Sequence, residues 1–353
     1  MKTLARQYKT AVSLVVYNGA KYLSYCLAGI AEQTYKDFFL LIIDNASIDE
    51  SVKVINNFLI TSPELHKRTR IVANSKNLGF ARAHNQVFQW TAGDYFFLLN
   101  QDVLLDENYL YNLVKFAEKK TNAAAFQGKI LKWFFNPTSY RLDLHKNLHK
   151  ISTFDSCGLA VSKSRHTYNI REGEFDQAQA QQDTEVFGVT GAAPLYRRSA
   201  LEHIKYDNQV LDEDFVTYKE DVDISWRLKN AGFEAWYVPQ AICYHHRSLA
   251  KPERLALVTQ ARAHWPEQMK VYSCRNHWLV LLKNDCLVNL LRYFPYIFWY
   301  EIKKLGYRLF IEPKVLFKAI AQFIFLFSAA LKKRSYINNN RKISCSELRR
   351  WFL

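Results

Sequence analysis

The sequence predicts an α/β fold with a largely parallel sheet, followed by a helical extension that is basic and aromatic. Three observations support this fold class: short apolar runs alternate with segments of helical length, these runs end in polar residues, and the composition changes after about residue 255. The chain has 353 residues, of which 49% are hydrophobic and only 11 are Gly, so it can bury a sizeable core.

The expected strands and helices of the first half follow one another in βαβ order. Strand-like runs occupy residues 12–17, 39–44, 70–73 and 94–99, and helix-length segments lie between them at 20–33, 49–59 and 80–91. Ligands in such sheets bind beyond the carboxyl ends of the strands. Those ends are polar here, and they carry Tyr17 and Asn18, Asp44 and Asn45, Asn74, and Asn100 to Asp102.

The second half of the chain is less regular. Residues 133–183 are polar and without clear periodicity, and we expect an insertion or lid there. Apolar character resumes at 186–196, and a helix is expected to begin near Tyr218 and to end at Asn230, before Gly232. The later change in composition predicts two units, a sheet-containing domain over residues 1–250 and a helical extension over 251–353.

The formal net charge of +15 is concentrated in the extension. Residues 1–250 hold 29 Lys and Arg against 27 Asp and Glu, whereas residues 251–353 hold 19 against 6. The apolar runs of the extension are short or interrupted by charges such as Lys318, and they fall below the ~20 residues that span a bilayer. We therefore expect amphipathic helices that lie on an anionic membrane surface, with helices packed on the first domain as the alternative.

The six cysteines are scattered, without a close pair at metal-ligand or redox spacing. This usage fits a reducing cytosol. The apolar run at 11–16 is too short for a signal peptide and is better interpreted as a first strand. We therefore expect a cytoplasmic protein whose cysteines are reduced.

The polar element that follows the strand at 94–99 is a candidate metal site. Strand alternation is expected to place Asn100 and Asp102 on the same side of the strand end. Mg²⁺ and Mn²⁺ prefer oxygen ligands and commonly keep substrate phosphates in their coordination shell. A carboxylate here can hold a metal that bridges a diphosphate, and a polar turn that closes the strand is the alternative.

Three further clusters carry candidate chemistry. Asp44 ends a strand and can accept a hydrogen bond from a nucleobase or ribose. Glu220 and Asp221 open an amphipathic helix, where Asp221 is a candidate general base; carboxylates that merely suit the helix dipole are the alternative. His245 and His246 follow an apolar stretch, and because neighbours on a strand point to opposite faces, at most one is expected to bind a metal.

Together and in this order, these stretches resemble the inverting glycosyltransferases of family 2, and among them the rhamnosyltransferase-like enzymes of cell-surface polysaccharide assembly. The matching stretches are 12–18 with 33–35, 44–47, 77–81, 93–102, 187–198, 218–228 and 237–248. The resemblance spans residues 10–250 and implies a nucleotide-sugar-binding, Rossmann-like domain of the glycosyltransferase A type.

The resemblance also implies roles for individual residues. Asp221, the second acid of the pair with Glu220, matches the catalytic base, Asp102 matches the metal-binding acid, and His245 is the expected second metal contact. The nucleotide sugar is expected to contact Tyr17, Asn18, Asp44, Asn77, Gly79, Phe80 and Asn100. One departure stands out: Asn100 replaces the first Asp of the family's Asp-x-Asp motif, which predicts weaker metal binding because only Asp102 supplies charge.

The implied reaction is a single in-line displacement that uses Mg²⁺ or Mn²⁺. The expected donor is dTDP-L-rhamnose, and the expected acceptor is a lipid-linked saccharide or polysaccharide at the inner face of the plasma membrane. A UDP-hexose-dependent transferase of the same fold and a non-enzymatic nucleotide-sugar-binding homologue are the alternatives.

Two other classes fit the sequence less well. A dinucleotide-dependent oxidoreductase is disfavoured because no Gly-x-Gly-x-x-Gly motif follows the first strand. A nucleic-acid-binding protein would use the basic extension but would leave Asp44, Asp102 and Asp221 without roles. No nucleic-acid partner is therefore expected.

Overall fold

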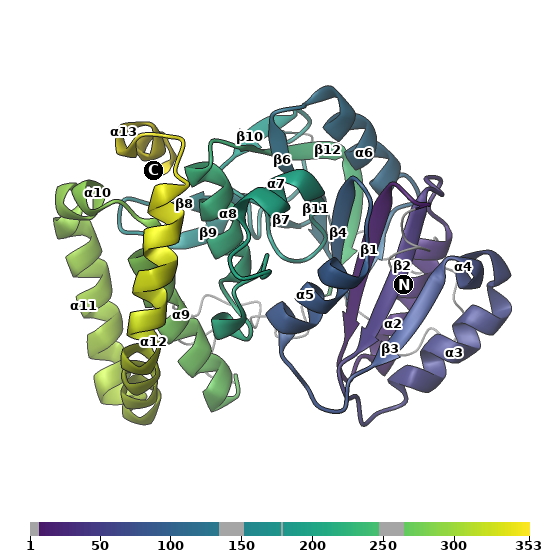
Figure 1. The fold of residues 1–353 in the computed structure, drawn as a ribbon, viewed down its shortest axis with the longest axis horizontal. Coiled ribbons are helices and arrows are strands. Elements are labelled where there is room, and N and C mark those ends of the chain that lie inside the picture. The colour runs from purple at the N-terminus through teal and green to yellow at the C-terminus, as the bar shows by residue number, and fades with distance from the viewer. Residues whose placement is uncertain (1–6, 134–151, 178, 247–264) are drawn as a thin grey trace.

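A computed structural model of the chain describes residues 7–133, 152–177, 179–246 and 265–353 (Figure 1). Its first half alternates strands and helices as the sequence predicts. The strands are β1 (Thr10–Val16), β2 (Phe38–Asp44), β3 (Thr69–Ala73) and β4 (Tyr95–Asn100), and the helices are α2 (Ala20–Ala31), α3 (Ser51–Thr61), α4 (Pro63–Lys67) and α5 (Phe80–Trp90). Only the short α4 was not expected.

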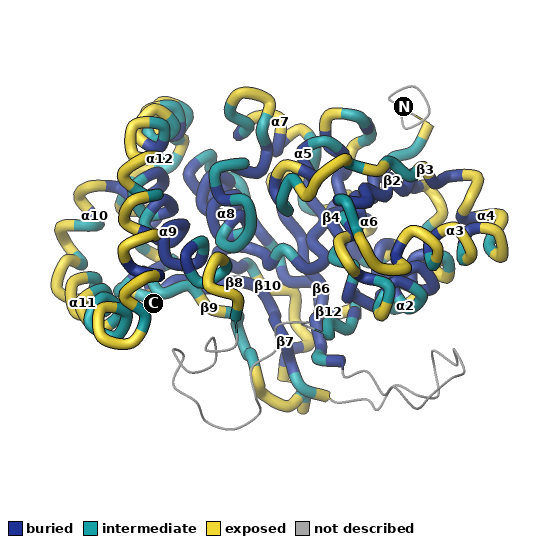
Figure 2. The backbone as a smooth tube through the Cα atoms, turned by 90° about the horizontal axis from the view of Figure 1, so that it is seen from below, coloured by how far each residue is buried: buried dark blue, intermediate teal, exposed yellow. Residues whose placement is uncertain are grey.

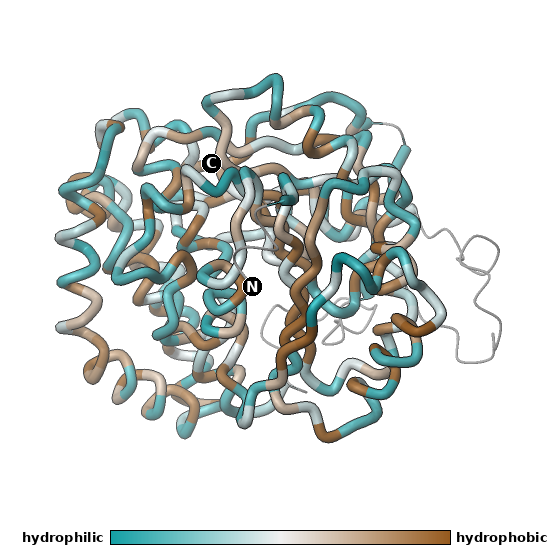
Figure 3. The backbone as a smooth tube through the Cα atoms, turned by 45° about the vertical axis from the view of Figure 1, so that its right-hand side comes forward, coloured by the Kyte–Doolittle hydropathy of each residue, from teal (hydrophilic) through white to brown (hydrophobic). Residues whose placement is uncertain are grey.

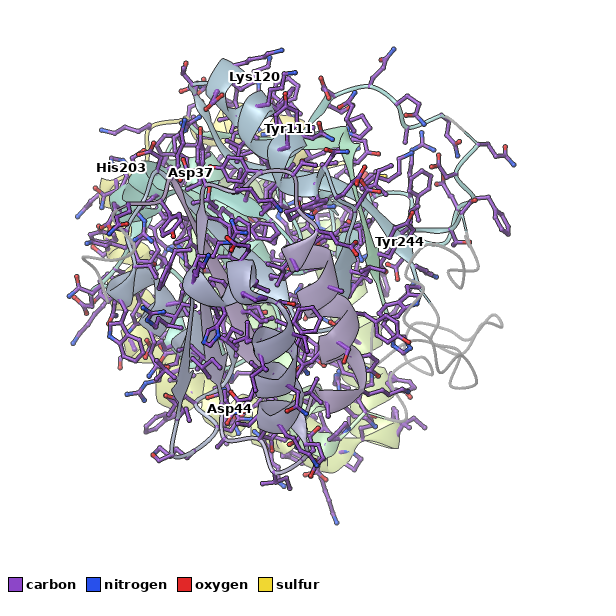
Figure 4. All side chains as sticks on the ribbon, turned by 90° about the vertical axis from the view of Figure 1, so that its right-hand side faces the viewer. Asp37, Asp44, Tyr111, Lys120, His203 and Tyr244 are labelled. Carbon is purple, nitrogen blue, oxygen red and sulfur yellow. A yellow bond between two sulfur atoms is a disulfide. The ribbon has the colours of Figure 1, made fainter. Side chains whose placement is uncertain are left out.

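These four strands are parallel neighbours in the order β3, β2, β1, β4. Their registers pair Val16 with Asp44 and Val15 with Asn100, so the carboxyl ends of β1, β2 and β4 meet at one edge of the sheet. Figure 4 labels Asp37 and Asp44, which lie at opposite ends of β2, with Asp44 at the end where the strands finish. The polar strand ends therefore converge as expected.

The rest of the sheet is mixed rather than largely parallel. The later elements are β5 (Val103–Leu105), α6 (Tyr109–Lys119), β6 (Ala123–Lys132), β7 (Phe154–Ser156), β8 (Leu159–Val161), β9 (Thr167–Asn169), β10 (Thr184–Val186), β11 (Leu195–Arg197), α7 (Arg198–Ile204), η1 (Glu213–Phe215), α8 (Glu220–Asn230) and β12 (Glu234–His245). The main sheet has the order β10, β12, β6, β11, β4, β1, β2, β3, and β5 and β7 join it at β12 and β6.

Strand β11 makes the sheet beyond β4 mixed, whereas the four strands whose alternation with helices predicts a parallel sheet are parallel. It runs antiparallel to both of its neighbours, β4 and β6. The chain enters it from the carboxyl edge, where Asn100 N donates to Ala192 O at 2.9 Å. Consequently β11 returns across the sheet from the edge at which β4 ends.

The core lies on both faces of the central strands. All seven residues of β2 are buried, and Figure 3 colours the crossing central strands as the most hydrophobic part of the molecule. Strands buried on both faces are typical of a sheet covered by helices on each side. This explains why the strands are near-continuous apolar runs in the sequence.

The described part of the expected insertion or lid belongs to the sheet region. Residues 134–151 and 178 lie outside the described residues, but β7 pairs with β6 and the hairpin of β8 and β9 follows it. Asp155 on β7 is fully buried, with 1% of its surface exposed. The described residues of this segment therefore form part of the folded body.

The extension forms a helical layer against α8 (Figure 1). It comprises α9 (Glu267–Asn284), α10 (Leu287–Arg292), α11 (Phe294–Ile311), α12 (Pro313–Asn339), α13 (Cys345–Leu348) and η3 (Arg349–Trp351). The chain end returns to the first domain, where Leu353 N donates to Val161 O at 3.0 Å. Phe352 shares a buried cluster with Trp226 of α8. The predicted boundary at residue 250 falls within 247–264, outside the described residues.

Two features of the extension differ from what the sequence predicts. Among the described residues, α12 is long and apolar enough by length and composition to cross a membrane, because an 18-residue stretch of it carries no more than two charged side chains. Such a helix is weak evidence for a span, since helices of soluble proteins pass the same test. The cysteines also differ: Cys286 and Cys345 form a disulfide, while Cys26, Cys157, Cys243 and Cys274 are free and buried. The pair is 59 residues apart in the chain, yet the fold brings the two Cα atoms to 6.0 Å.

Candidate active site

The carboxyl edge of β1 and β2 is organised by short hydrogen bonds between strand-end residues. Asn18 has a positive φ of 49°, its backbone N–H donates to Ser47 Oγ at 3.0 Å, and its side chain accepts from Ile48 N at 2.9 Å. Asp44 is 4% exposed and accepts from Ser47 N at 3.3 Å. The nucleotide contacts predicted at Asn18 and Asp44 therefore lie together on one loop pair.

Tyr17 is held at the same edge from β4. Its backbone N–H donates to Gln101 Oε1 at 3.0 Å, and its carbonyl accepts from Gln101 Nε2 at 3.1 Å. The Tyr17 side chain is 44% exposed, which leaves its ring available to a ligand. Asn100 ends β4 beside it.

The loop before α5 is tied to β2 by an amide network. Asn45 donates to Asn77 Oδ1 at 2.9 Å and accepts from Leu78 N at 3.0 Å. Gly79 N in turn donates to Asn77 Oδ1 at 2.8 Å. These bonds bring Asn77, Gly79 and the following Phe80 to the edge that carries Asp44, as the sequence predicts.

Gly79 is required at its position for two reasons. Its φ of 82° is a conformation that residues with a side chain rarely adopt, and an added Cβ would lie 2.7 Å from Val216 Cγ1. The close approach brings the residue-216 segment, which leads into α8, against the start of α5.

The predicted metal contacts Asp102 and His245 are adjacent. His245 Nε2 lies 3.3 Å from Asp102 Oδ1, and His245 Nδ1 lies 3.0 Å from Asp155 Oδ2. Burial opposes a charged imidazole, but the two carboxylates outweigh it and raise the pKa of His245 to about 9. The ring of His246 packs against that of Tyr22, with the centroids 4.8 Å apart, whereas the ring of His245 contacts the Asp102 carboxylate.

The donor set of Asp102 and His245 fits a divalent cation that borrows further ligands from its substrate. A carboxylate oxygen and an imidazole nitrogen suit Mn²⁺ or Mg²⁺ that also binds phosphate oxygens and water. Across the parts of the chain that the structure describes, no group of three or more His, Cys, Asp or Glu is arranged to hold a metal. A diphosphate would therefore complete the coordination.

The predicted base lies at the first turn of α8. Asp221 Oδ1 accepts from Val222 N at 2.8 Å, and Asp221 Oδ2 accepts from Gly191 N at 3.3 Å. The residue after Gly191 is Ala192, whose carbonyl pairs with Asn100 at the end of β4. Asp221 is thus placed beside the same strand end as the candidate metal ligands.

Glu220 and Asp221 share a buried environment that separates their roles. Burial and the charge of Asp221 raise the pKa of Glu220 to about 8, and burial also raises the pKa of Asp221. Glu220 Oε2 is buried without a hydrogen-bond partner among the described residues, which favours its neutral form. Two backbone N–H groups favour the ionised form of Asp221, so Asp221 is better placed than Glu220 to carry the negative charge of the pair.

Asp223 belongs to the structure rather than to this pair. It is fully buried, and it binds Arg227 at 2.9 Å and Lys283 of α9 at 2.8 Å. These cations, together with Asn284, keep the pKa of Asp223 below its ordinary value despite burial. The pairing of Asp223 with Arg227 four residues later was expected from helix spacing.

Sequence reasoning missed Asp155 and Gln101 as parts of the site. Asp155 lies in a segment expected to be a lid, 90 residues before the histidine that it binds. Gln101 sits inside the predicted metal element, but its bonds to Tyr17 span 84 residues. No local pattern signals such long-range partners.

Comparison with known proteins identifies relatives of this chain. The family described as Glycosyl transferase family 2 matches residues 12–205. The poly-beta-1,6-N-acetyl-D-glucosamine synthase of Staphylococcus epidermidis is 22% identical over 265 residues, covering 75% of this chain and 55% of that protein. Glycosyltransferase GlyG of Streptococcus pneumoniae is 26% identical over 110 residues, covering 31% of this chain and 35% of that protein. This chain spans about half the length of the synthase that it matches.

Solved structures share the fold at low sequence identity. GalNAc-T7, solved with UDP, GalNAc and Mn²⁺, gives a TM-score of 0.57 at 14% identity and covers 78% of this chain and 48% of its own. TarS residues 1–349 of S. aureus, solved with UDP-GlcNAc, gives a TM-score of 0.51 at 13% identity and covers 98% and 92%. These likenesses bear out the predicted glycosyltransferase A-type α/β fold with a helical C-terminal region.

Proposed function

This chain belongs to glycosyl transferase family 2, and from that premise we propose that it is an inverting transferase that moves one sugar from a nucleoside diphosphate to an acceptor hydroxyl. The observation that carries the proposal is the meeting of three groups at one strand edge: the Asp44 loop, the Asp102–His245 pair and the ionised Asp221. The three groups match the parts of the substrates: the Asp44 loop would face the nucleoside, the Asp102–His245 pair the diphosphate with its metal, and Asp221 the acceptor hydroxyl.

The proposed base is Asp221. It takes the proton of the acceptor hydroxyl as that oxygen attacks the anomeric carbon, and the bond to the diphosphate breaks on the opposite side. Because Glu220 stays protonated, the negative charge of the pair lies on Asp221. The carboxylic acid proton of Glu220 then remains beside the acceptor. Because attack and departure occur in one step, no covalent intermediate on the enzyme is needed.

Asp102 and His245 are the proposed ligands for Mg²⁺ or Mn²⁺. When bound there, the cation supplies positive charge to the departing diphosphate. Asp155 accepts the Nδ1 hydrogen of His245, so Nε2, which lies beside Asp102, is the ring nitrogen that would bind the cation once its own proton is lost. Gln101 and Asn100 hold the strand end that carries Asp102. The Mn²⁺ in the GalNAc-T7 structure is in keeping with this assignment.

The proposed donor is dTDP-L-rhamnose, on the resemblance to rhamnosyltransferase-like enzymes. UDP-N-acetylglucosamine is the second candidate, because UDP-GlcNAc is bound in the TarS structure and a poly-N-acetylglucosamine synthase is among the relatives. Either sugar nucleotide would place its base near Asp44 and its diphosphate near Asp102. Contacts between the protein and the sugar would decide between the two donors.

A panel of sugar nucleotides tests the reaction class and the donor together. We expect one donor to raise the melting temperature of the protein and to be hydrolysed slowly in Mn²⁺ or Mg²⁺, with both effects lost in EDTA. Protection that is equal with EDTA and with metal would contradict metal use. Protection without turnover for every donor and acceptor tried would instead favour the non-enzymatic homologue.

The proposed acceptor is a lipid-linked saccharide or polysaccharide, reached from an anionic membrane surface. Most large exposed hydrophobic side chains of the described residues lie on α10, α11 and α12; Leu291, Trp299, Phe310 and Phe325 are 67%, 61%, 83% and 84% exposed. Figure 2 shows this exposed outer side at one edge of the molecule, away from buried α9. We call it the apolar outer face. So much exposed apolar surface on adjacent helices is typical of an interaction site.

The charges around the apolar outer face favour anionic lipid over a second copy of the chain. Its exposed charged residues are all basic and include Arg292, Lys303, Lys314, Lys318 and Lys332. The two acids of these helices are engaged inside, Glu301 with His277 and Glu312 with Lys270. A symmetric dimer through this face would bring like charges together, whereas an anionic leaflet complements them.

We propose that α12 lies on the membrane rather than across it. Lys333 near its end binds Asp212 and Asp214 of the first domain, and Val315 and Ala319 near its start are buried. A helix fixed to the protein along its length can present only its outer side to lipid. This favours a peripheral attachment.

The proposed location is the cytoplasmic face of the plasma membrane. The basic surface and the four free cysteines support it, whereas the Cys286–Cys345 disulfide points the other way. Alkylation in denaturant at the moment of cell lysis is the direct test. Six alkylated cysteines support the proposal, and four would overturn it.

A further inference from the structure

The loop that leads into α8 has an unusual backbone. Val216, Tyr218 and Lys219 have positive φ angles of 63°, 69° and 70°, a region that residues other than glycine seldom enter. At Val216 the angles φ 63° and ψ −61°, with a bond from Thr217 N to Phe215 O at 2.6 Å, make a γ-turn of the rare, strained kind. Such a turn at a β-branched residue persists only when its surroundings hold it.

This γ-turn contacts both halves of the proposed active site. The Val216 carbonyl accepts from Phe80 N at 2.8 Å and from Ala81 N at 3.3 Å, so it caps the start of α5. It lies next to residues 77–79, which we call the donor loop because they are proposed to contact the sugar nucleotide. On its other side the chain enters α8, where Asp221 lies two residues after Lys219. A shift of the turn would therefore move the base and the donor loop together.

Side chains of α9 hold the turn: Arg275 Nη2 donates to Phe215 O at 3.2 Å, and Asn276 makes the remaining bonds. Asn276 is fully buried, and its Nδ2 donates toward the carbonyl oxygens of Phe215, Thr217 and Tyr218 at 3.0, 2.9 and 2.8 Å. Its Oδ1 accepts from Arg275 Nε at 2.9 Å, which fixes the side of the amide that faces the loop.

We propose that Asn276 is a positioning residue for catalysis: it holds the Val216 turn so that Asp221 and the donor loop keep their alignment. The inference rests on the proposed function in that it takes Asp221 as the base. Asn276 lies in the predicted extension and outside the matched residues 12–205. The extension therefore completes the active site, in addition to any membrane contact it makes.

The first test compares two changes of Asn276 with a matched control. Asn276→Ala removes the amide, and the isosteric Asn276→Asp replaces its donor by an oxygen. Asn289→Ala is the control, because Asn289 is also fully buried in the extension and its amide donates to Cys345 O at 2.8 Å, away from the loop. We expect the Asn276 variants to lower kcat per folded molecule by ~10- to 100-fold and to raise the donor KM by about 3- to 10-fold, because the base and the donor loop rest on the same turn.

The control is expected to keep the wild-type kcat per folded molecule. A wild-type kcat in both Asn276 variants, or an equal loss in Asn289→Ala, would overturn the proposal. Partial unfolding would lower the apparent kcat but leave the KM of the remaining folded enzyme unchanged, so kcat is expressed per folded molecule and a raised donor KM separates a displaced turn from lost stability.

A double variant tests whether Asn276 acts through the turn. Glycine adopts positive φ without strain, so in Val216→Gly the turn should depend less on the hydrogen bonds of Asn276. The same change should favour folding of the double variant. In that background the loss of the Asn276 amide is expected to cost under ~5-fold in kcat. If the fold-loss in kcat of the double variant equals the product of the two single losses, Asn276 does not act through the Val216 turn, and the proposal is overturned.

Hydrogen exchange examines the loop without reference to turnover. We expect faster exchange at residues 214–222 and 77–82 in the Asn276 variants but not in Asn289→Ala. Unchanged exchange at these residues would show that Asn276 does not hold the turn. Faster exchange in the Asn276 variants, together with wild-type turnover in Asp221→Asn, would support the role of Asn276 in holding the turn and refute Asp221 as the base. Failure of this inference and failure of the proposed function are therefore distinguishable.

Discussion

Glu220 and Asp221 hold one negative charge between two buried carboxyl groups, and the reaction depends on which residue carries it. Burial raises the pKa of both, and the charge of Asp221 raises that of Glu220 further, to about 8. Two backbone N–H groups stabilise the charge on Asp221. The neighbours therefore divide into an ionised base and a neutral acid.

Replacing the proposed base should separate catalysis from donor binding. Asp221→Asn keeps the size of the side chain and loses the proton acceptor, so kcat should fall by about 10²–10⁴-fold while donor affinity stays near wild type. Steady-state kinetics and calorimetry with the nucleoside diphosphate measure the two quantities. A variant that turns over at the wild-type rate would remove Asp221 from the mechanism.

The same pair predicts a pH dependence of stability. The folded protein keeps the Glu220 proton up to about pH 8, whereas the unfolded chain releases it near its ordinary pKa of 4.5. Between these values the folded state binds more protons, so the free energy of unfolding should fall as pH rises. Glu220→Gln should weaken this trend, to which His245 also contributes, and its free energy of unfolding should exceed that of wild type by on the order of 1–3 kcal/mol at about pH 8.

Urea unfolding at about pH 5 and pH 8 measures this difference. Glu64→Gln on exposed α4 is the control, and it should leave the slope of stability against pH unchanged. Equal slopes for wild type and Glu220→Gln would show that Glu220 is ionised in the folded protein.

Asp155 offers a test of the metal assignment that does not rely on activity. Asp155→Asn should weaken the hold on His245 Nδ1 and lower Mn²⁺ affinity by roughly 10- to 100-fold, whereas Asp102→Ala should abolish it. Calorimetry of Mn²⁺ in the presence of the nucleoside diphosphate gives both affinities. Undiminished binding in Asp102→Ala would place the metal elsewhere.

Among the elements, two glycines, one immediately before α5 and one inside α11, are expected to affect stability in opposite ways. Gly79 precedes α5 at positive φ and faces Val216, whereas Gly306 lies inside α11 with nothing within 4 Å of an added Cβ. Gly79→Ala should lower the free energy of unfolding by about 1–3 kcal/mol and weaken donor binding. Gly306→Ala should instead raise stability by about 0.5–1 kcal/mol.

Denaturant unfolding with donor titration distinguishes the two glycine variants. If Gly79→Ala kept both stability and donor affinity, the tight approach of the donor loop to the segment before α8 would have no role in binding.

On the scale of the whole molecule, the apolar outer face of α10–α12 predicts two separable parts of membrane binding. Each exposed basic residue near an anionic leaflet contributes roughly 1 kcal/mol of attraction, which salt screens within a Debye length of about 8–10 Å. Inserted side chains such as Trp299 add an apolar part that salt leaves intact. Binding to anionic vesicles should weaken in high salt without vanishing.

Charge-matched variants locate that surface. Changing Lys303, Lys314 and Lys332 together to Glu should abolish flotation with anionic vesicles, whereas the same change at Lys53, Lys67 and Lys115, on α3, α4 and α6 at the other end of the molecule (Figure 1), should leave it. Equal flotation with anionic and neutral vesicles, or equal effects of the two triple variants, would argue for an extension that serves only as a packed layer.

Much of the fold and part of the site could be predicted from the sequence alone. Strand and helix periodicities are local, so the βαβ order and the convergence of Tyr17, Asp44 and Asn100 at one edge were available from the spacing of apolar residues. The opposite directions of His245 and His246 followed from strand alternation in the same way.

Only the tertiary structure decided the partners of these groups. Strand β11 reverses direction between β4 and β6, Asp155 reaches His245 across 90 residues, Cys286 meets Cys345 across 59, and Asn276 of α9 holds the Val216 turn. The two segments in each contact are far apart in the sequence, so neither periodicity nor a local motif indicates that they meet. The physical reason is that burial and hydrogen-bond satisfaction act on the folded chain as a whole, so they select partners that sequence spacing does not specify.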